Sequence, residues 1–99
     1  MTSYRIALGV GLLRPGTLPD DVLPAAAGAA RATTTVESYD LAIVRGQARI
    51  NVRFLAQSNE EAVVVARCVL ATVRKLASVT GPDLARQYGP RWHPVSWVP

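Results

Sequence analysis

The chain has 99 residues, of which 49% are hydrophobic and 18% charged, and its formal net charge at neutral pH is +4. This length suits one domain with a single small core, and the hydrophobic content argues against intrinsic disorder. No apolar run approaches the roughly 20 residues of a membrane-spanning helix, and one cysteine, Cys68, allows neither an internal disulfide nor a cysteine-based metal site. The first residues lack a signal-peptide pattern, so we expect a cytoplasmic protein.

The first predicted element is a strand over residues 4–12. Apolar side chains alternate along it with small or charged ones, which are Arg5, Ala7, Gly9 and Gly11. Because successive side chains of a strand point to opposite faces, these four residues share the face away from the core. The two glycines predict a shallow trough there. They lie inside a strand pattern without the third glycine of a dinucleotide-binding loop, so that loop is not expected.

Residues 17–30 predict the first helix. Thr17 is its expected cap, and Asp20 and Asp21 suit the positive end of the helix dipole. Proline is tolerated only near a helix start, so we expect the regular helix to begin near Pro24 after a preceding turn.

Residues 33–44 and 47–56 predict a β-hairpin joined by a two-residue turn at Arg45-Gly46, because glycine tolerates the positive φ of such turns. In this register Leu41 faces Ile50 and Ile43 faces Ala48, all pointing inward, while Asp40 faces Asn51 on the other side. The alternation shifts at residues 37–39, which indicates a β-bulge. The second strand of the hairpin presents three polar side chains away from the core: Arg49, Asn51 and Arg53.

Residues 58–79 predict the second helix. Ser58 and Glu61 have the spacing of a capping box. Cys68 is expected to be a small buried hydrophobe on this helix. Gly81-Pro82 is expected to end it, with one short helical turn over residues 83–88. The apolar stripe expected to face the core is Ala62, Val65, Ala66, Val69, Val73 and Leu76.

The final segment, residues 89–99, contains both tryptophans, three prolines and the single histidine. Proline lacks the N–H that a central strand donates, so we expect this segment to form an edge strand or an extended arm. Residues 1–88 are expected to form the domain itself.

The element order predicts an α+β fold of the ferredoxin-like kind, β-α-β-β-α(-β), with an antiparallel sheet and both helices on one face. Right-handed crossovers would bring the first and third strands together in the middle of the sheet. The glycines and arginines of those strands would then lie side by side on the face without helices.

That sheet face and the C-terminal arm supply the candidate interaction residues, which are Arg5, Gly9, Gly11, Arg49, Asn51, Arg53, Trp92, His93 and Trp97. Arginine and tryptophan are favoured at protein interfaces and in binding hot spots. We therefore expect a non-catalytic interaction or assembly module that forms homo-oligomers, or binds another protein, through the open sheet face or the arm.

In strand order the plan resembles RNA-recognition-motif domains. Those domains stack bases on aromatic side chains of the first and third strands, whereas the matching positions here are small, polar or positively charged. Nucleic-acid binding remains an alternative, because the arginines can contact phosphates. A second alternative is a planar small molecule held beneath the tail by Trp92, His93 and Trp97.

No catalytic, metal or cofactor site is predicted. His93 has no second histidine and no suitably placed pair of carboxylates to share a metal with. It also lacks a nucleophile or an orienting partner within a recognisable motif. We therefore do not expect an enzyme.

Overall fold

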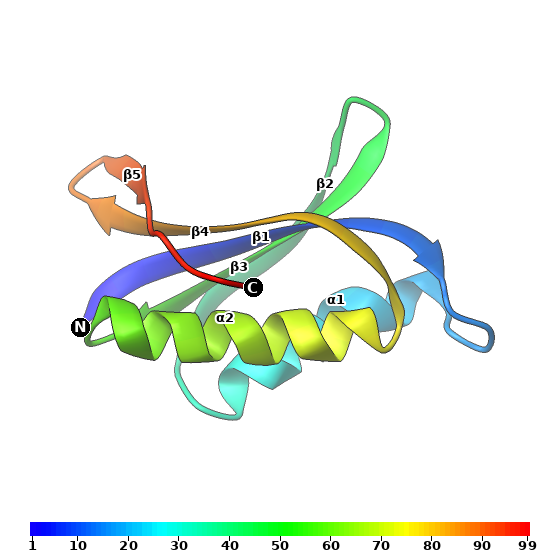
Figure 1. The fold of residues 1–99 in the computed structure, drawn as a ribbon, viewed down its shortest axis with the longest axis horizontal. Helices are drawn as coiled ribbons and strands as arrows, with labels where there is room; N and C mark the ends of the chain where they lie inside the picture. The colour runs from blue at the N-terminus through cyan, green and yellow to red at the C-terminus, as the bar shows by residue number, and fades with distance from the viewer.

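The computed structural model describes all 99 residues as five strands and two helices (Figure 1). In chain order they are β1 (Thr2–Leu13), α1 (Pro19–Arg31), β2 (Val36–Val44), β3 (Gln47–Ala56), α2 (Asn59–Arg74), β4 (Ala77–Tyr88) and β5 (Arg91–Pro94). The strands form one antiparallel sheet in the order β2-β3-β1-β4-β5, and both helices cover the same face of it. The predicted α+β class is confirmed, as is the adjacency of β1 and β3. Neither helix has the length and apolarity that crossing a membrane requires.

The core lies between the sheet and the helices and is centred on β1. Tyr4, Ile6 and Leu8 are fully buried, and they pair with Phe54, Val52 and Ile50 of β3, which are buried too. Each such side chain contributes about 1.5–3 kcal/mol relative to an exposed one. The sheet face opposite the helices is here called the outer face, and it carries the alternate residues of each strand.

The β2–β3 hairpin has the predicted register. Leu41 pairs with Ile50, Ile43 with Ala48 and Asp40 with Asn51, and a register shift follows Val36 where the bulge was expected. Arg45 and Gly46 have φ values of 53° and 78°, which is the pair of left-handed residues that suits the twist of a two-residue hairpin.

Helix α1 begins earlier than predicted, at Pro19. Leu18 is its N-cap, and the Asp21 carboxylate accepts a hydrogen bond from the Leu18 N–H at 3.1 Å, so the assignment of Thr17 as cap is wrong. Pro24 lies inside the helix with its ring exposed. The acidic first turn and this backbone bond are sufficient to start the helix ahead of Pro24.

Helix α2 ends at Arg74, and the prediction that it continues to residue 79 is wrong. Arg14 stabilises this end, because its guanidinium donates to the Arg74 carbonyl at 3.3–3.4 Å and its N–H to the Leu76 carbonyl at 2.7 Å. The stripe predicted to face the core is buried from Ala62 to Val73. Cys68 is exposed, which contradicts its predicted burial, because it lies on the side of the helix opposite that stripe.

Residues 77–88 form strand β4, where a helix end and a short helical turn were expected. Gly81-Pro82 does not stop this strand, since it forms a bulge: Ala7 pairs with Asp83 and Gly9 with Thr80, so two residues lie opposite Leu8 alone. Gly81 has a φ of 52°. Pairing along the central strand β1 decides the conformation here, and local helical periodicity does not.

The C-terminal segment forms the edge strand β5 and then returns toward α2 (Figure 1). Val95 donates its N–H to the Leu84 carbonyl at 2.8 Å, and the Arg67 Nε donates to the Val98 carbonyl at 3.0 Å. Trp97 is half-buried and packs against the core.

Candidate functional site

The outer face brings six of the predicted site residues together. In the β1–β3 register Arg5 pairs with Arg53 and Gly9 with Arg49, while Asn51 lies opposite Ala7 and Gly11 continues the same face. The sequence pattern was sufficient to place these residues, because strand alternation and strand adjacency are both readable from it.

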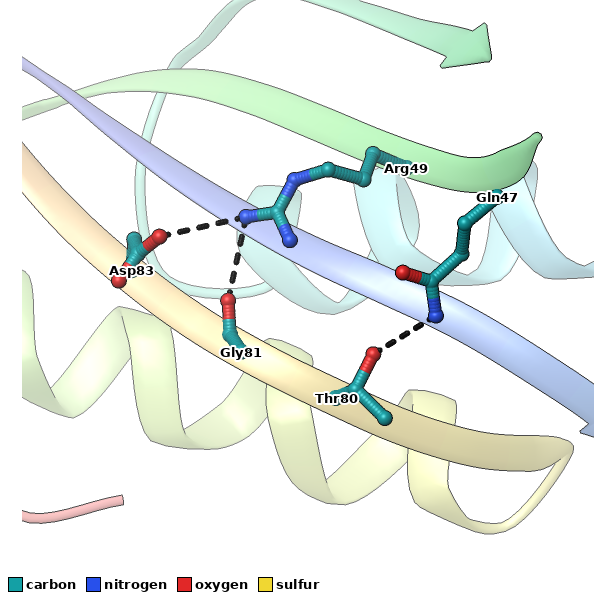
Figure 2. Close-up of polar contacts among 5 residues, drawn as sticks. All are labelled: Gln47, Arg49, Thr80, Gly81 and Asp83. Atoms are coloured by element: carbon teal, nitrogen blue, oxygen red, sulfur yellow. Dashed lines mark hydrogen bonds and ion pairs between the residues drawn. The ribbon is translucent and has the colours of Figure 1, made fainter. Parts of the chain in front are cut away.

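The trough above the glycines is occupied by side chains of the protein itself (Figure 2). Gln47 reaches over β1, and its Nε2 donates to Thr80 Oγ1 at 2.9 Å. Arg49 does the same, and its Nη2 donates to the Gly81 carbonyl at 3.1 Å and to Asp83 Oδ2 at 3.3 Å. A Cβ on Gly9 would clash with Thr80 Oγ1 and lie 3.2 Å from Gln47 Nε2. The expectation of an open trough is therefore wrong.

Two further polar side chains of the outer face, Arg53 and Asn51, are also hydrogen-bonded. Arg53 donates from Nε to Glu37 at 3.3 Å and from Nη2 to Gln87 at 2.9 Å, and Asn51 donates to Asp40 at 2.9 Å. Each exposed ion pair stabilises the fold by about 0–1 kcal/mol. Their larger effect is on binding, since a phosphate approaching Arg53 must compete with a carboxylate already present.

Trp92 lies on the outer face beside two of the predicted arginines. From β5 it pairs with Gln87 of β4, whose side chain meets Arg53 on the outer face, and this pairing places Trp92 on the same side. The guanidinium of Arg5 is 4.7 Å from the ring centroid, and that of Arg53 is 5.3 Å away. These cation–π contacts are worth about 0.5–1 kcal/mol each at an exposed site. The face thus carries one aromatic ring, supplied by an edge strand.

His93 lies on the opposite side of the sheet from Trp92, because consecutive residues of a strand alternate. Its ring meets the edge of Tyr88 at a centroid distance of 5.0 Å. Arg86 and Asn59 are its other neighbours around a shallow hollow. The predicted trio of Trp92, His93 and Trp97 therefore does not share one pocket.

Tyr4 is fully buried beside the hollow that His93, Arg86 and Asn59 surround. Its hydroxyl donates to Asn59 Oδ1 at 2.7 Å, and Arg86 Nη1 donates to the same oxygen at 3.2 Å. Burial raises the pKa of the Tyr4 phenol, and the positive charge of Arg86 opposes part of that rise. The Arg86 Nε has no hydrogen-bonding partner, and the guanidinium lies against the rings of Tyr4 and Tyr88.

Trp92 and Trp97 do line one hollow, of about 530 Å³, between the C-terminal segment and β4. Arg5 and Asp83 reach it from the outer face. It holds apolar surface together with one charge of each sign.

The surface that the sequence did not reveal is the open edge of the sheet at β2. Tyr39, Leu41 and Ile43 point to the helix side of the sheet, yet they are 43%, 49% and 66% exposed. Leu41 and Ile43 therefore point to the predicted side of the sheet, but the burial that this side implied is wrong, because the hairpin extends beyond the two helices (Figure 1). The predicted strand order could have indicated this surface, because it places β2 at the edge of a sheet that is too wide for two helices to cover.

Comparisons with protein-family models, curated proteins and solved structures found no match to this chain. Its function must be argued from its own surfaces. Three are available: the outer face, the hollow beneath the C-terminal segment, and the β2 edge.

Proposed function

We propose that this protein is a non-catalytic interaction module that self-associates, built on a ferredoxin-like plan to which β5 adds a fifth strand. The strand order β2-β3-β1-β4 with two helices on one face supports that plan. The interaction is assigned to the hairpin edge, in place of the sheet face or the arm that the sequence suggested.

The observation that carries this proposal is the apolar character of an unpaired edge strand. β2 is exposed along nearly its whole length, and four of its large apolar or aromatic side chains are open to solvent: Tyr39, Leu41, Ile43 and Val44. Soluble proteins usually protect such an edge with prolines, lysines or a covering element, because it can pair with another strand. β2 has a bulge after Val36 and two carboxylates, Glu37 and Asp40, but its segment Leu41–Val44 has no charge, proline or bulge.

The outer face is a weaker candidate. Its arginines Arg49 and Arg53 are already engaged by Asp83 and Glu37, which also lowers its net positive charge. Nucleic-acid binding would require breaking those pairs, and only one aromatic ring, that of Trp92, is at hand for stacking.

Analytical ultracentrifugation tests the proposal across a range of about 1–100 µM, which resolves dissociation constants in the micromolar range. We expect a dimer that dissociates on dilution. A sedimentation coefficient of a monomer over the entire range would overturn it.

The hollow lined by Trp92 and Trp97 supports a second candidate function, binding of a small planar ligand. Two indole rings beside Arg5 offer stacking together with a counter-charge for an anionic group. Titrating the protein with a panel of aromatic carboxylates, while following its tryptophan fluorescence, tests this candidate. Trp97→Phe is the matched variant. A panel that leaves the emission of the wild-type protein unchanged would remove this candidate.

A further inference from the structure

We infer that two copies of this chain join through their β2 strands, antiparallel and about a twofold axis at Leu41, so that the two sheets become one. The inference rests on the proposed self-association and specifies its surface and register. Four separate features lead to it: the direction of the free backbone groups, the contrast between the two sheet edges, the charges along β2, and the exposed apolar side chains.

The free backbone groups of β2 belong to the same residues as its exposed apolar side chains. In a hairpin with a two-residue turn, the residues flanking the turn, Val44 and Gln47, form a hydrogen-bonded pair. The bonding alternates along the strand, so Ala42 and Asp40 also point their backbone groups toward β3. Those of Ile43, Leu41 and Tyr39 therefore face the open edge.

The other edge of the sheet is less suited to such pairing, because β5 covers only Ala85–Tyr88 of β4 and the rest of β4 is interrupted by the Gly81-Pro82 bulge. β5 spans only Arg91–Pro94, and its last residue has no N–H to donate. The next residue, Val95, already gives its N–H to Leu84. Because a twofold axis uses the same strand of both copies, pairing through β2 ends at a dimer and does not continue into a filament.

Charge and strand length favour this register over its two neighbours. With the axis at Leu41, Tyr39 lies opposite Ile43 of the second copy, and Asp40 lies opposite Ala42. An axis at Asp40 would place two carboxylates directly opposite each other, which is unfavourable. An axis at Ala42 would move Tyr39 beyond the end of the partner strand, opposite the turn residue Arg45.

The selected register also gathers the exposed apolar side chains. Tyr39, Leu41 and Ile43 of both copies would lie together on the helix side, and the paired strands would exchange about six main-chain hydrogen bonds. The guanidinium of Arg31 lies 5.2 Å from the Tyr39 ring centroid and would stand at the rim of this cluster. A polar rim around an apolar centre is typical of protein interfaces.

A pair of substitutions at Ala42 tests the register. Ala42 lies on the outer side, half-buried and opposite Arg49 of its own chain. Ala42→Asp would face Asp40 of the second copy, and we expect the dimer Kd to rise about tenfold or more. Ala42→Lys would face the same carboxylate, and we expect a smaller rise, because the opposite charge offsets part of the cost of a lysine at the edge. Equal effects of the two variants, in proteins with wild-type circular dichroism, would overturn the register.

Cysteine cross-linking tests the axis independently of stability. In a Cys68→Ser background, Leu41→Cys places the new thiol of each copy opposite the same thiol of the second copy. The Cα separation of about 5.5 Å is one that a disulfide can span. Ile43→Cys is the matched control, because the offset of four residues separates the two thiols by roughly 14 Å. We expect an oxidised dimer from the first variant only, and equal cross-linking of both would exclude the axis at Leu41.

The two proposals fail in different ways. A wild-type protein that sediments as a monomer removes self-association and this interface together. If the wild-type protein is a dimer, but Ala42→Asp leaves the dimer Kd unchanged and Leu41→Cys gives no oxidised dimer, self-association stands and the β2 edge is excluded as its surface.

Discussion

Arg49 on β3 and Asp83 on β4 form an ion pair of 3.3 Å that passes over the intervening strand β1 (Figure 2). These strands are two places apart in the sheet, so only long side chains can span the distance between them, as Arg53 and Gln87 also do. The β1 residues beneath this ion pair are small, since Arg49 pairs with Gly9 and Asp83 with Ala7. The neighbouring Gln47–Thr80 bridge requires the missing Cβ of Gly9, because a Cβ there would clash with Thr80 Oγ1 and lie 3.2 Å from Gln47 Nε2.

The first prediction concerns this glycine. Gly9→Ala should lower the free energy of unfolding by about 1–3 kcal/mol, because the new Cβ would clash with Thr80 Oγ1 and displace the Gln47 bridge. Urea denaturation measures the change. Gly28→Ala is the control, since a Cβ there meets nothing within 4 Å and should raise helix α1 stability by about 0.5–1 kcal/mol. A Gly9→Ala protein as stable as wild type would show that this bridge is dispensable.

The second prediction concerns alkaline pH. Burial raises the pKa of Tyr4, so the folded protein holds the phenol proton more tightly than the unfolded chain does. The resulting stability is fully present below the unfolded pKa of about 10 and is lost as pH rises through the higher folded value. We expect the midpoint of urea unfolding to fall above about pH 10 more steeply for wild type than for Tyr4→Phe. Identical slopes for the two proteins would contradict the assignment.

The hairpin was predictable because its signal is local. Arg45-Gly46 fixes the turn, the turn fixes the register, and the register fixes which side each residue faces. The pattern could not reveal whether that side is covered. Leu41 and Ile50 form a cross-strand pair, yet Ile50 is fully buried and Leu41 is half exposed. The layer of helices covers β3 at this point but does not reach across β2.

Strand β4 was not predictable for the opposite reason. Ala77, Val79 and Leu84 continue the apolar content of α2, and Gly81-Pro82 reads locally as a helix stop. What makes the segment a strand is pairing with β1, more than 60 residues earlier in the chain. The positions of Trp92 and His93 depend on β4 in turn, so their separation onto opposite faces could not be deduced either.

The third prediction tests the proline inside α1. Pro24 cannot donate to the Asp20 carbonyl, and its ring faces solvent, so nothing in the core depends on it. Pro24→Ala restores that donor, and we expect a net gain of about 1–2 kcal/mol, less than the full cost of an interior proline because the unfolded chain also gains freedom. Thermal unfolding by circular dichroism measures it. A lower melting temperature would show that the proline is required to shape the turn before the helix.

The fourth prediction separates the roles of the two tryptophans and asks whether residues 95–99 belong to the folded domain. Trp97 packs against the core beneath a segment held by the Val95–Leu84 and Arg67–Val98 hydrogen bonds. Trp92 makes only the two cation–π contacts of the outer face and its edge pairing.

Trp97→Ala should therefore cost about 2 kcal/mol, roughly half the value for a fully buried aromatic residue, and Trp92→Ala about 1 kcal/mol, the low end of two exposed cation–π contacts. Chemical denaturation followed by circular dichroism compares them without relying on the indole signal. Deleting residues 95–99 should cost at least as much as Trp97→Ala, because Leu84 would lose its backbone partner as well as its cover. If the deletion left the unfolding midpoint unchanged, the segment would be an independent arm, and the hollow between it and β4 would have no fixed wall.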